Sequence, residues 1–175
     1  GLDSEELHLE LGRIYNEQAD YPKALQEFQA AQSLNPSNTR NHLELGQLYR
    51  RLKDYDKAVE YFLKAKELGL DSEELHLELG RIYNEKEDYE KALQEFHAAK
   101  SLNPSNALLC LIMAQLYRKL KDYLPAFREL DRAVELGFDN DELHVELGMV
   151  YKQTGAYSLA LEEFNTALLL NPKRS

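Results

Sequence analysis

The chain has 175 residues and a formal net charge of −10, from 31 acidic and 21 basic side chains. This excess of carboxylates argues against nucleic acid or an anionic membrane as the main partner. The leucine-rich stretches are short and interrupted by charge, so we expect no membrane-spanning segment. The single cysteine, Cys110, excludes an internal disulfide and leaves the redox compartment open. The start lacks a signal-peptide pattern, and we expect a cytoplasmic protein by default.

Two helices are predicted within residues 5–38. The first has an apolar stripe at helical spacing, formed by Leu7, Leu11, Ile14 and Tyr15. Asp3 or Ser4 can cap this helix, and Glu5 and Glu6 lie in its first turn, where the helix dipole favours anions. The turn that follows is short, so the two helices must run antiparallel.

The second helix of this unit is predicted to begin at Asp20, which can cap it, and to tolerate Pro22 in its first turn. Its apolar stripe consists of Ala24, Leu25, Phe28 and Ala31, and Asn35-Pro36 ends it. Gly12 and Ala24 are small where the two helices would approach closely, and Phe28 supplies bulk for packing between neighbouring hairpins.

The same pattern returns at a fixed spacing along the whole chain, as the series Gly12, Gly46, Gly80 and Gly148 illustrates. It predicts five helical hairpins, at residues 5–38, 39–72, 73–106, 107–140 and 141–174. Such hairpins stack side by side into a solenoid in which each unit touches only its neighbours. Residues 1–38 and 69–106 differ at only five positions, which favours a copied segment in an engineered or excised array.

This pattern of Leu-Gly, Tyr, Ala, Phe, Ala and Pro resembles the tetratricopeptide repeat. The resemblance covers residues 1–175 as a single array and implies an all-α fold, a right-handed superhelical solenoid of antiparallel helix pairs. Departures are mild: histidine or cysteine stands at the usual Trp position, and the fourth repeat has Met113-Ala114 for Leu-Gly and Leu130 for Phe. Pentatricopeptide arrays, which read RNA, have a similar period, but their binding face is basic and this chain is acidic.

In the tetratricopeptide family the first helix of each repeat lines a concave groove that binds a protein or peptide. The positions in this chain that match ligand-contacting positions of the family are Glu10, Arg13, Arg40, Glu44, Gln47, Arg50, Glu78, Arg81, Leu108, Ile112, Gln115, Arg118, Glu146 and Met149. The resemblance therefore implies a non-catalytic interaction scaffold.

Two interpretations of the charged groove positions stay open. Glu10 lies three residues before Arg13, and Glu78 three before Arg81, so these pairs can neutralise each other on a solvated face. Alternatively, the recurring glutamates make a mixed-charge groove for basic or mixed-charge peptides. The clamp with which some family members hold a chaperone's carboxylate is not expected, because Glu44, Glu74 and Glu78 would repel it.

The first helix of the fourth repeat is apolar nearly all round. Leu108 and Ile112, with Met149 of the next repeat, can form an apolar anchor site for a ligand or can be extra packing between repeats. The sequence does not decide between these two interpretations.

No catalytic motif, cofactor motif or metal-ligand cluster is recognisable, so we expect a non-enzyme without metal or cofactor. His8, His42, His76 and His144 recur at the same position of their repeats, too far apart to share an ion, and are interpreted as structural.

Three functional hypotheses remain: a peptide-binding scaffold, a structural or engineered array without a natural ligand, and a regulatory fragment of a larger protein. The end of the chain suggests a further property. Its last helix is apolar where a sixth repeat would pack, and we expect self-association as a homo-oligomer through Leu161, Phe164, Leu168 and Leu169.

Overall fold

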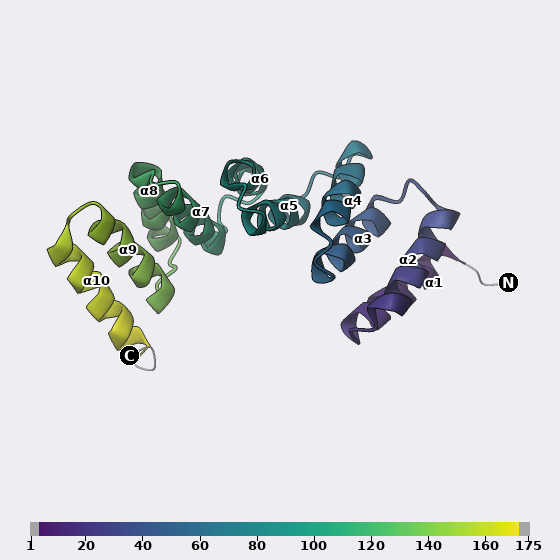
Figure 1. Ribbon diagram of the computed structural model, residues 1–175, viewed down its shortest axis with the longest axis horizontal. Helices are drawn as coiled ribbons and strands as arrows, with labels where there is room; N and C mark the ends of the chain where they lie inside the picture. The colour runs from purple at the N-terminus through teal and green to yellow at the C-terminus, as the bar shows by residue number, and fades with distance from the viewer. Residues whose placement is uncertain (1–3, 172–175) are drawn as a thin grey trace. The chain divides into compact units, whose positions relative to one another are not determined.

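The computed structural model describes residues 4–171, and within them the chain forms ten α-helices and no strand (Figure 1). The helices are α1 (Glu5–Glu17), α2 (Tyr21–Leu34), α3 (Thr39–Arg51), α4 (Tyr55–Glu67), α5 (Glu73–Glu85), α6 (Tyr89–Leu102), α7 (Ala107–Lys119), α8 (Tyr123–Glu135), α9 (Asp141–Gln153) and α10 (Tyr157–Leu170). The all-α fold of antiparallel helix pairs predicted from the sequence is confirmed.

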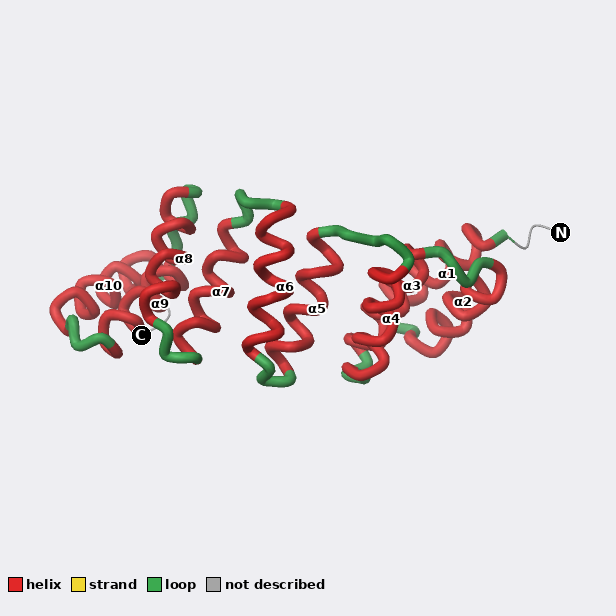
Figure 2. Tube along the Cα trace, turned by 90° about the horizontal axis from the view of Figure 1, so that it is seen from above, coloured by secondary structure: helices red, strands yellow, loops and turns green. Residues whose placement is uncertain are grey.

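The helices belong to two compact units, residues 1–86 and 87–175. In the N-terminal unit α1 pairs with α2 and α3 with α4, and the first helices α1, α3 and α5 contact one another in succession. In the C-terminal unit α7 pairs with α8 and α9 with α10, and α7 contacts α9. Only short loops join the helices of a pair (Figure 2).

Helix ends follow the capping residues that the sequence predicts. The Ser4 side chain caps α1, and the Asp20 side chain accepts a hydrogen bond from the Lys23 backbone N–H at the start of α2. Helix α2 ends at Leu34, directly before Asn35-Pro36. Asp3, the alternative cap of α1, lies outside the described residues.

The close approach within a hairpin depends on a glycine in its first helix. The Phe28 ring lies over Gly12, and a Cβ on Gly12 would stand 2.5 Å from Phe28 Cε1. The Phe62 ring over Gly46 and the Phe164 ring over Gly148 repeat this geometry. Phe28 thus fills space inside its own hairpin, whereas the sequence pointed to packing between hairpins.

The pattern changes in the fourth repeat, where Ala114 takes the glycine position and Leu130 the phenylalanine position. Both are completely buried and belong to the core cluster of the C-terminal unit. A smaller side chain on the second helix thus accompanies the added methyl group on the first.

The turn inside each hairpin contains one residue with a left-handed backbone. Ala19, Lys53, Glu87 and Lys121 have φ between 59° and 61°, and Gly155 occupies the same position of the fifth repeat with φ of 84°. A left-handed conformation costs a non-glycine residue roughly 1–2 kcal/mol. Four of the five turns therefore carry a strain that glycine would relieve.

Replacing Lys53 or Lys121 by glycine is expected to stabilise its unit by about 0.5–1 kcal/mol, because relief of this strain exceeds the extra entropy of the unfolded chain. Gly155→Ala is the matched reverse change and should destabilise by about 1 kcal/mol. Urea unfolding followed by circular dichroism measures both effects. Equal midpoints for wild type and the lysine variants would contradict the strain argument.

Loops between repeats are of two alternating kinds. After α2 and α6 the chain passes through Asn-Pro-Ser-Asn, whose last asparagine (Asn38 or Asn106) caps the next helix. After α4 and α8 it passes through Gly69 or Gly137, with φ of 94° and 79°. Where α2 meets α3, Asn41 Nδ2 donates to the Phe28 carbonyl at 2.9 Å, which fixes the position of α3 against the preceding hairpin.

Candidate functional site

Two cavities lie side by side on the first helices of the N-terminal unit and share Arg40. The first, of about 340 Å³, is lined by Glu6, Leu9, Glu10, Arg13, Asn38 and Arg40. The second, of about 280 Å³, is lined by Thr39, Arg40, Leu43, Glu44, Leu70, Ser72 and Glu74. We call them the Arg40 cavities. They bring together Glu10, Arg13, Arg40 and Glu44 of the residues predicted for the groove.

Arg40 is exposed at the start of α3, and its side chain has no ion pair within residues 4–171. Asn38 Oδ1 accepts from the Arg40 backbone N–H at 2.8 Å, so the helix cap fixes the backbone while the guanidinium stays available. Glu6, which also lines the first cavity, is an exposed carboxylate that is likewise without an ion pair in this range.

Arg13 also lines the first cavity. Its Nε donates to Glu44 Oε1 at 2.7 Å, and its Nη1 pairs with Glu10. Burial lowers the pKa of Arg13, but the hydrogen bond and charge of Glu44, with the charge of Glu10, outweigh burial and raise that pKa above its usual value. Arg13 Nη2 is buried without a hydrogen-bond partner, so this nitrogen can still donate to an acceptor that enters the cavity.

Other predicted groove residues join neighbouring repeats to one another. Arg50 of α3 pairs with Glu78 of α5, and Arg118 of α7 pairs with Glu146 of α9. The glutamates are only 5% and 4% exposed. Because their carboxylates are covered by arginine, they stabilise the contact between first helices and offer little surface to a ligand.

The remaining charged and polar groove positions of the N-terminal unit are also engaged. Arg81 Nη1 donates to Glu78 Oε1 at 2.8 Å, three residues away on the same helix. Gln47 Nε2 donates to Glu74 Oε1 at 2.7 Å, from α3 to α5. The predicted neutralisation along the helix is therefore present for both the Glu10–Arg13 and Glu78–Arg81 pairs.

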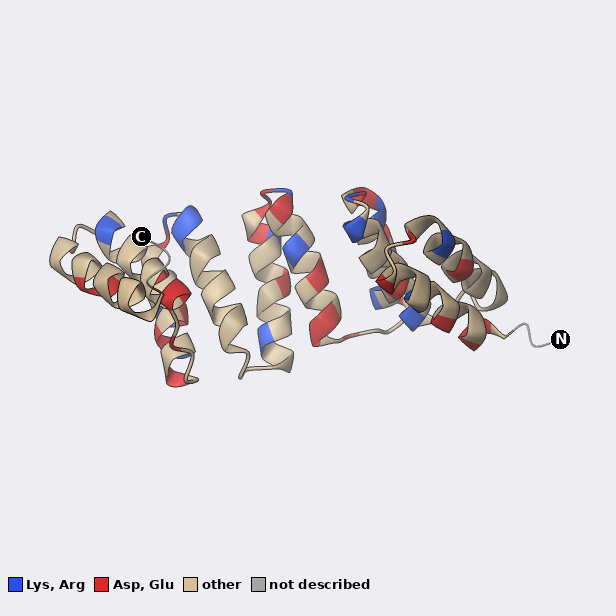
Figure 3. Cartoon of the chain, turned by 90° about the horizontal axis from the view of Figure 1, so that it is seen from below, with Lys and Arg blue, Asp and Glu red and all other residues tan. Residues whose placement is uncertain are grey.

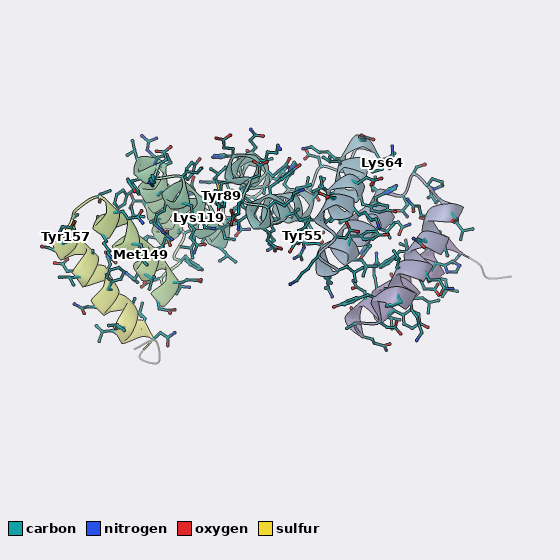
Figure 4. All side chains as sticks on the ribbon, viewed as in Figure 1. Tyr55, Lys64, Tyr89, Lys119, Met149 and Tyr157 are labelled. Carbon is teal, nitrogen blue, oxygen red and sulfur yellow. The ribbon has the colours of Figure 1, made fainter. Side chains whose placement is uncertain are left out.

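The fourth repeat presents little charge on its first helix. In Figure 3 the ribbon of α7 is almost uncoloured except at its C-terminal end, where Arg118 and Lys119 lie. Leu108 and Met149 are exposed, and Ile112 and Gln115 are half-buried. Figure 4 labels Met149 on α9 and shows Lys119 close to Tyr89, with its Nζ 4.8 Å from the ring centroid.

The groove residues predicted from the sequence did not include Glu6, Asn38, Leu43 or Glu74, which also line the Arg40 cavities. Glu6, Arg40 and Glu74 occupy the second position of their first helices, and this position was among those that the family resemblance indicated. The cap at Asn38 could be predicted from its place before α3, but its role as a cavity wall depends on the distance between hairpins.

Two of the recurring histidines, His8 and His144, form hydrogen bonds between the two helices of a pair. His8 Nδ1 lies 2.6 Å from Glu27 Oε2, and His144 Nδ1 lies 2.6 Å from Glu163 Oε2. Burial lowers the pKa of His144, but hydrogen bonds to Glu163 and Asp139 outweigh it, so the pKa is raised. Within residues 4–171 no three His, Cys, Asp or Glu side chains are grouped closely enough to hold a metal ion.

The outer side of α10 is strongly apolar and exposed. Leu169 is 82% exposed and Leu161 63%, and Leu168 is also exposed, whereas Phe164 is half-buried. A cavity of about 200 Å³ lies beside them, lined by Val145, Phe164, Ala167 and Leu168. Tyr157, labelled in Figure 4, extends this surface at the start of α10.

The tetratricopeptide repeat profile matches residues 73–106 and 141–174, with the boundaries that the period of the sequence predicts. The chain therefore contains tetratricopeptide repeats. A second profile, that of regulator of microtubule dynamics protein 1-3, matches residues 13–88 of this array. No curated protein sequence matches the chain.

Solved structures of tetratricopeptide proteins share the fold at low sequence identity. The MamA protein superposes with a TM-score of 0.87 and 19% identity, covering 97% of this chain and 93% of MamA. A tetratricopeptide repeat protein from Parabacteroides merdae gives 0.90 at 20% identity, covering 99% and 68%. YrrB, a TPR protein with an unusual peptide-binding site, gives 0.86 at 18%, covering 98% and 88%.

These likenesses support a protein-interaction scaffold, and proteins of the tetratricopeptide family are generally non-catalytic. In the part of the array that the structure describes, no helix has the length and apolar composition to cross a membrane.

Proposed function

We propose that this tetratricopeptide array is a non-catalytic scaffold that holds an extended segment of a partner protein along its first helices, anchored in the Arg40 cavities. The observation that carries this proposal is the pair of adjoining cavities with uncompensated groups at their walls. A guanidinium, a carboxylate and a spare arginine N–H all face a space that no side chain of the described residues fills.

The arrangement favours a mixed-charge segment. Arg40 and the free Nη2 of Arg13 can hold a carboxylate or a backbone carbonyl, because both are donors without acceptors. Glu6 and the exposed Glu10 can hold a lysine or arginine beside it. The net charge of −10 gives the whole chain a preference for basic partners over nucleic acid. We also propose that the five repeats form one continuous array and that the protein acts in the cytoplasm.

Arg40→Glu is expected to weaken the binding of a peptide with alternating acidic and basic residues about tenfold, because a charge-assisted hydrogen bond is replaced by repulsion. Arg51→Glu, at an exposed position of the same helix, is the matched control and should leave affinity unchanged. Fluorescence anisotropy with a library of charge-patterned peptides measures both, at low and high salt.

Equal peptide affinities for wild type and Arg40→Glu would contradict the proposal that Arg40 anchors the peptide. If no peptide of any pattern binds, an array without a ligand is the better description. Charge reversal at Glu44 and Glu78 is a poorer test, because both carboxylates hold arginines in the fold and their loss would act on stability.

We propose in addition that two copies of the chain associate through the outer side of α10. The exposed leucines Leu161, Leu168 and Leu169 support this, since contiguous apolar surface of this kind promotes association.

Replacing Leu161, Leu168 and Leu169 by glutamine is expected to abolish concentration-dependent association. The control is Leu124→Gln, since Leu124 is 62% exposed but lies on α8. Sedimentation velocity from about 1 to about 300 μM covers the range of weak interfaces. A wild type that remains monomeric throughout would contradict the proposal.

A further inference from the structure

A third cavity of the N-terminal unit is larger than either of the Arg40 cavities and shares no residue with them. It has a volume of about 470 Å³ and lies between α2, the loop that follows it, the start of α3, and α4. Its walls are formed by Gln32, Pro36, His42, Glu60, Tyr61, Leu63, Lys64 and Glu67.

His42 is the buried polar wall of this cavity, at 4% exposure. Its Nε2 lies 2.8 Å from the Pro36 carbonyl oxygen. Because a carbonyl only accepts, Nε2 carries a proton, and in this tautomer Nδ1 is an acceptor. Nδ1 is buried and has no hydrogen-bond partner. A buried acceptor without a donor costs free energy, so this atom requires an explanation.

Comparison with the other repeats shows that the equivalent nitrogen elsewhere faces a carboxylate, to which it donates. In the first and fifth repeats the equivalent Nδ1 atoms, of His8 and His144, bond to Glu27 and Glu163. The same position in the second repeat is Tyr61. Substitution of this glutamate removes the group that bonds the histidine.

Tyr61 does not take over the role of the glutamate. Its ring stacks on Tyr49, with centroids 5.4 Å apart and an angle of 8° between planes, and its hydroxyl is hydrogen-bonded to Gln32. Its centroid lies 6.0 Å from that of His42. The ring therefore forms an aromatic wall beside the unpartnered nitrogen.

The charged groups that line this cavity leave more hydrogen-bond acceptors than donors without a partner. Lys64 Nζ donates to Glu67 Oε2 at 3.1 Å, and Lys64 projects from α4 as labelled in Figure 4. The Glu60 carboxylate has no ion pair within residues 4–171. Burial, the neighbouring Tyr49 and the charge of Glu60 raise the pKa of Tyr61, in accord with a negative charge near this wall. At this cavity the groups without a partner among the described residues are His42 Nδ1 and the Glu60 carboxylate, and both accept hydrogen bonds.

We propose that this cavity receives the guanidinium of an arginine side chain from a partner protein. The planar cation can lie along the Tyr61 ring and donate to His42 Nδ1 and to the Glu60 carboxylate. A neutral occupant would leave Glu60 uncompensated, and an anion would be repelled by it. The site is independent of the peptide groove, so either can exist without the other.

N-acetyl-arginine amide, a small mimic of such a side chain, is expected to bind the intact chain with a dissociation constant of roughly 1 mM. Saturable shifts of the His42 ring nitrogens in ¹⁵N spectra report the contact. N-acetyl-citrulline amide, neutral and of the same shape, and N-acetyl-lysine amide should bind at least about tenfold more weakly. Methylguanidinium tests whether the guanidinium cation alone, without the rest of the arginine, is enough for binding.

Tyr61→Glu is the matched variant, because it restores the residue found in the first and fifth repeats. Its carboxylate should accept a hydrogen bond from His42 Nδ1, so that this nitrogen no longer serves as an acceptor. Arginine-amide binding should then be lost while the helices remain intact by circular dichroism. Glu60→Gln, at an exposed position, provides a second test that leaves the core untouched. Absence of a saturable shift in wild type would overturn the proposal, as would equal binding of the citrulline amide or unchanged binding by both variants.

Discussion

Gly46→Ala is expected to destabilise the N-terminal unit by about 3 kcal/mol, because the new Cβ would lie 2.5 Å from the buried Phe62 ring. Phe62→Leu alone should cost about 1–2 kcal/mol through lost packing. The double variant is expected to lose about 2 kcal/mol in total, well below the sum, because leucine makes room for the methyl group. Urea denaturation of the four proteins measures this double-mutant cycle.

The fourth repeat supplies the reference for that cycle, since Ala114 and Leu130 already form the alternative combination in a fully buried core. Ala114→Gly is the control: it removes a methyl group without a clash and should cost about 1 kcal/mol. Additive effects of Gly46→Ala and Phe62→Leu on the unfolding free energy would mean that the two positions are not coupled through the contact of the ring with the glycine.

Loss of the Arg118 guanidinium is expected to lower the stability of the C-terminal unit by a similarly large amount. Arg118 Nη2 donates to Glu146 Oε2 at 3.3 Å while its Nε contacts Oε1, and the glutamate side chain is only 5% exposed. Arg118→Met leaves this carboxylate buried and unpaired, which should destabilise by about 3 kcal/mol. Combining it with Glu146→Leu should bring stability back to within about 1 kcal/mol of wild type.

Glu10→Gln tests an exposed ion pair under the same conditions. Glu10 is 63% exposed in its side chain, so breaking its contact with Arg13 should change the unfolding free energy by less than about 0.5 kcal/mol. Thermal and urea unfolding monitored by circular dichroism compare the three variants. A loss in Arg118→Met no larger than that in Glu10→Gln would show that Glu146 is solvated in solution.

The helices and their ends could be predicted from the sequence because their causes are local. Ser4 and Asp20 cap the helices that follow them, and Asn35-Pro36 ends α2 through the missing N–H and the restricted residue before proline. Because the pattern recurs regularly, the prediction made for one hairpin applies to each repeat and accounts for the ten helices of the described residues.

The candidate site was predictable only in part. Helical spacing placed Glu44, Glu78 and Glu146 on first helices, but it did not separate ligand-binding carboxylates from those covered by arginine. That distinction depends on the offset between neighbouring hairpins, which lets Arg50 reach Glu78 and Arg118 reach Glu146. The unpartnered nitrogen of His42 likewise results from Tyr61, which lies on a different helix of the same hairpin.

The alternation of loops bears on how such a gene can change length. Asn-Pro loops follow α2 and α6, and glycine loops follow α4 and α8, so the junctions repeat every second hairpin. Unequal crossing-over in steps of two hairpins regenerates both junctions unchanged. A step of one hairpin instead places an Asn-Pro loop before a helix such as α5, which a glycine loop precedes here. The pair of hairpins is therefore the unit that recombination can add or delete without changing the kind of loop at either junction.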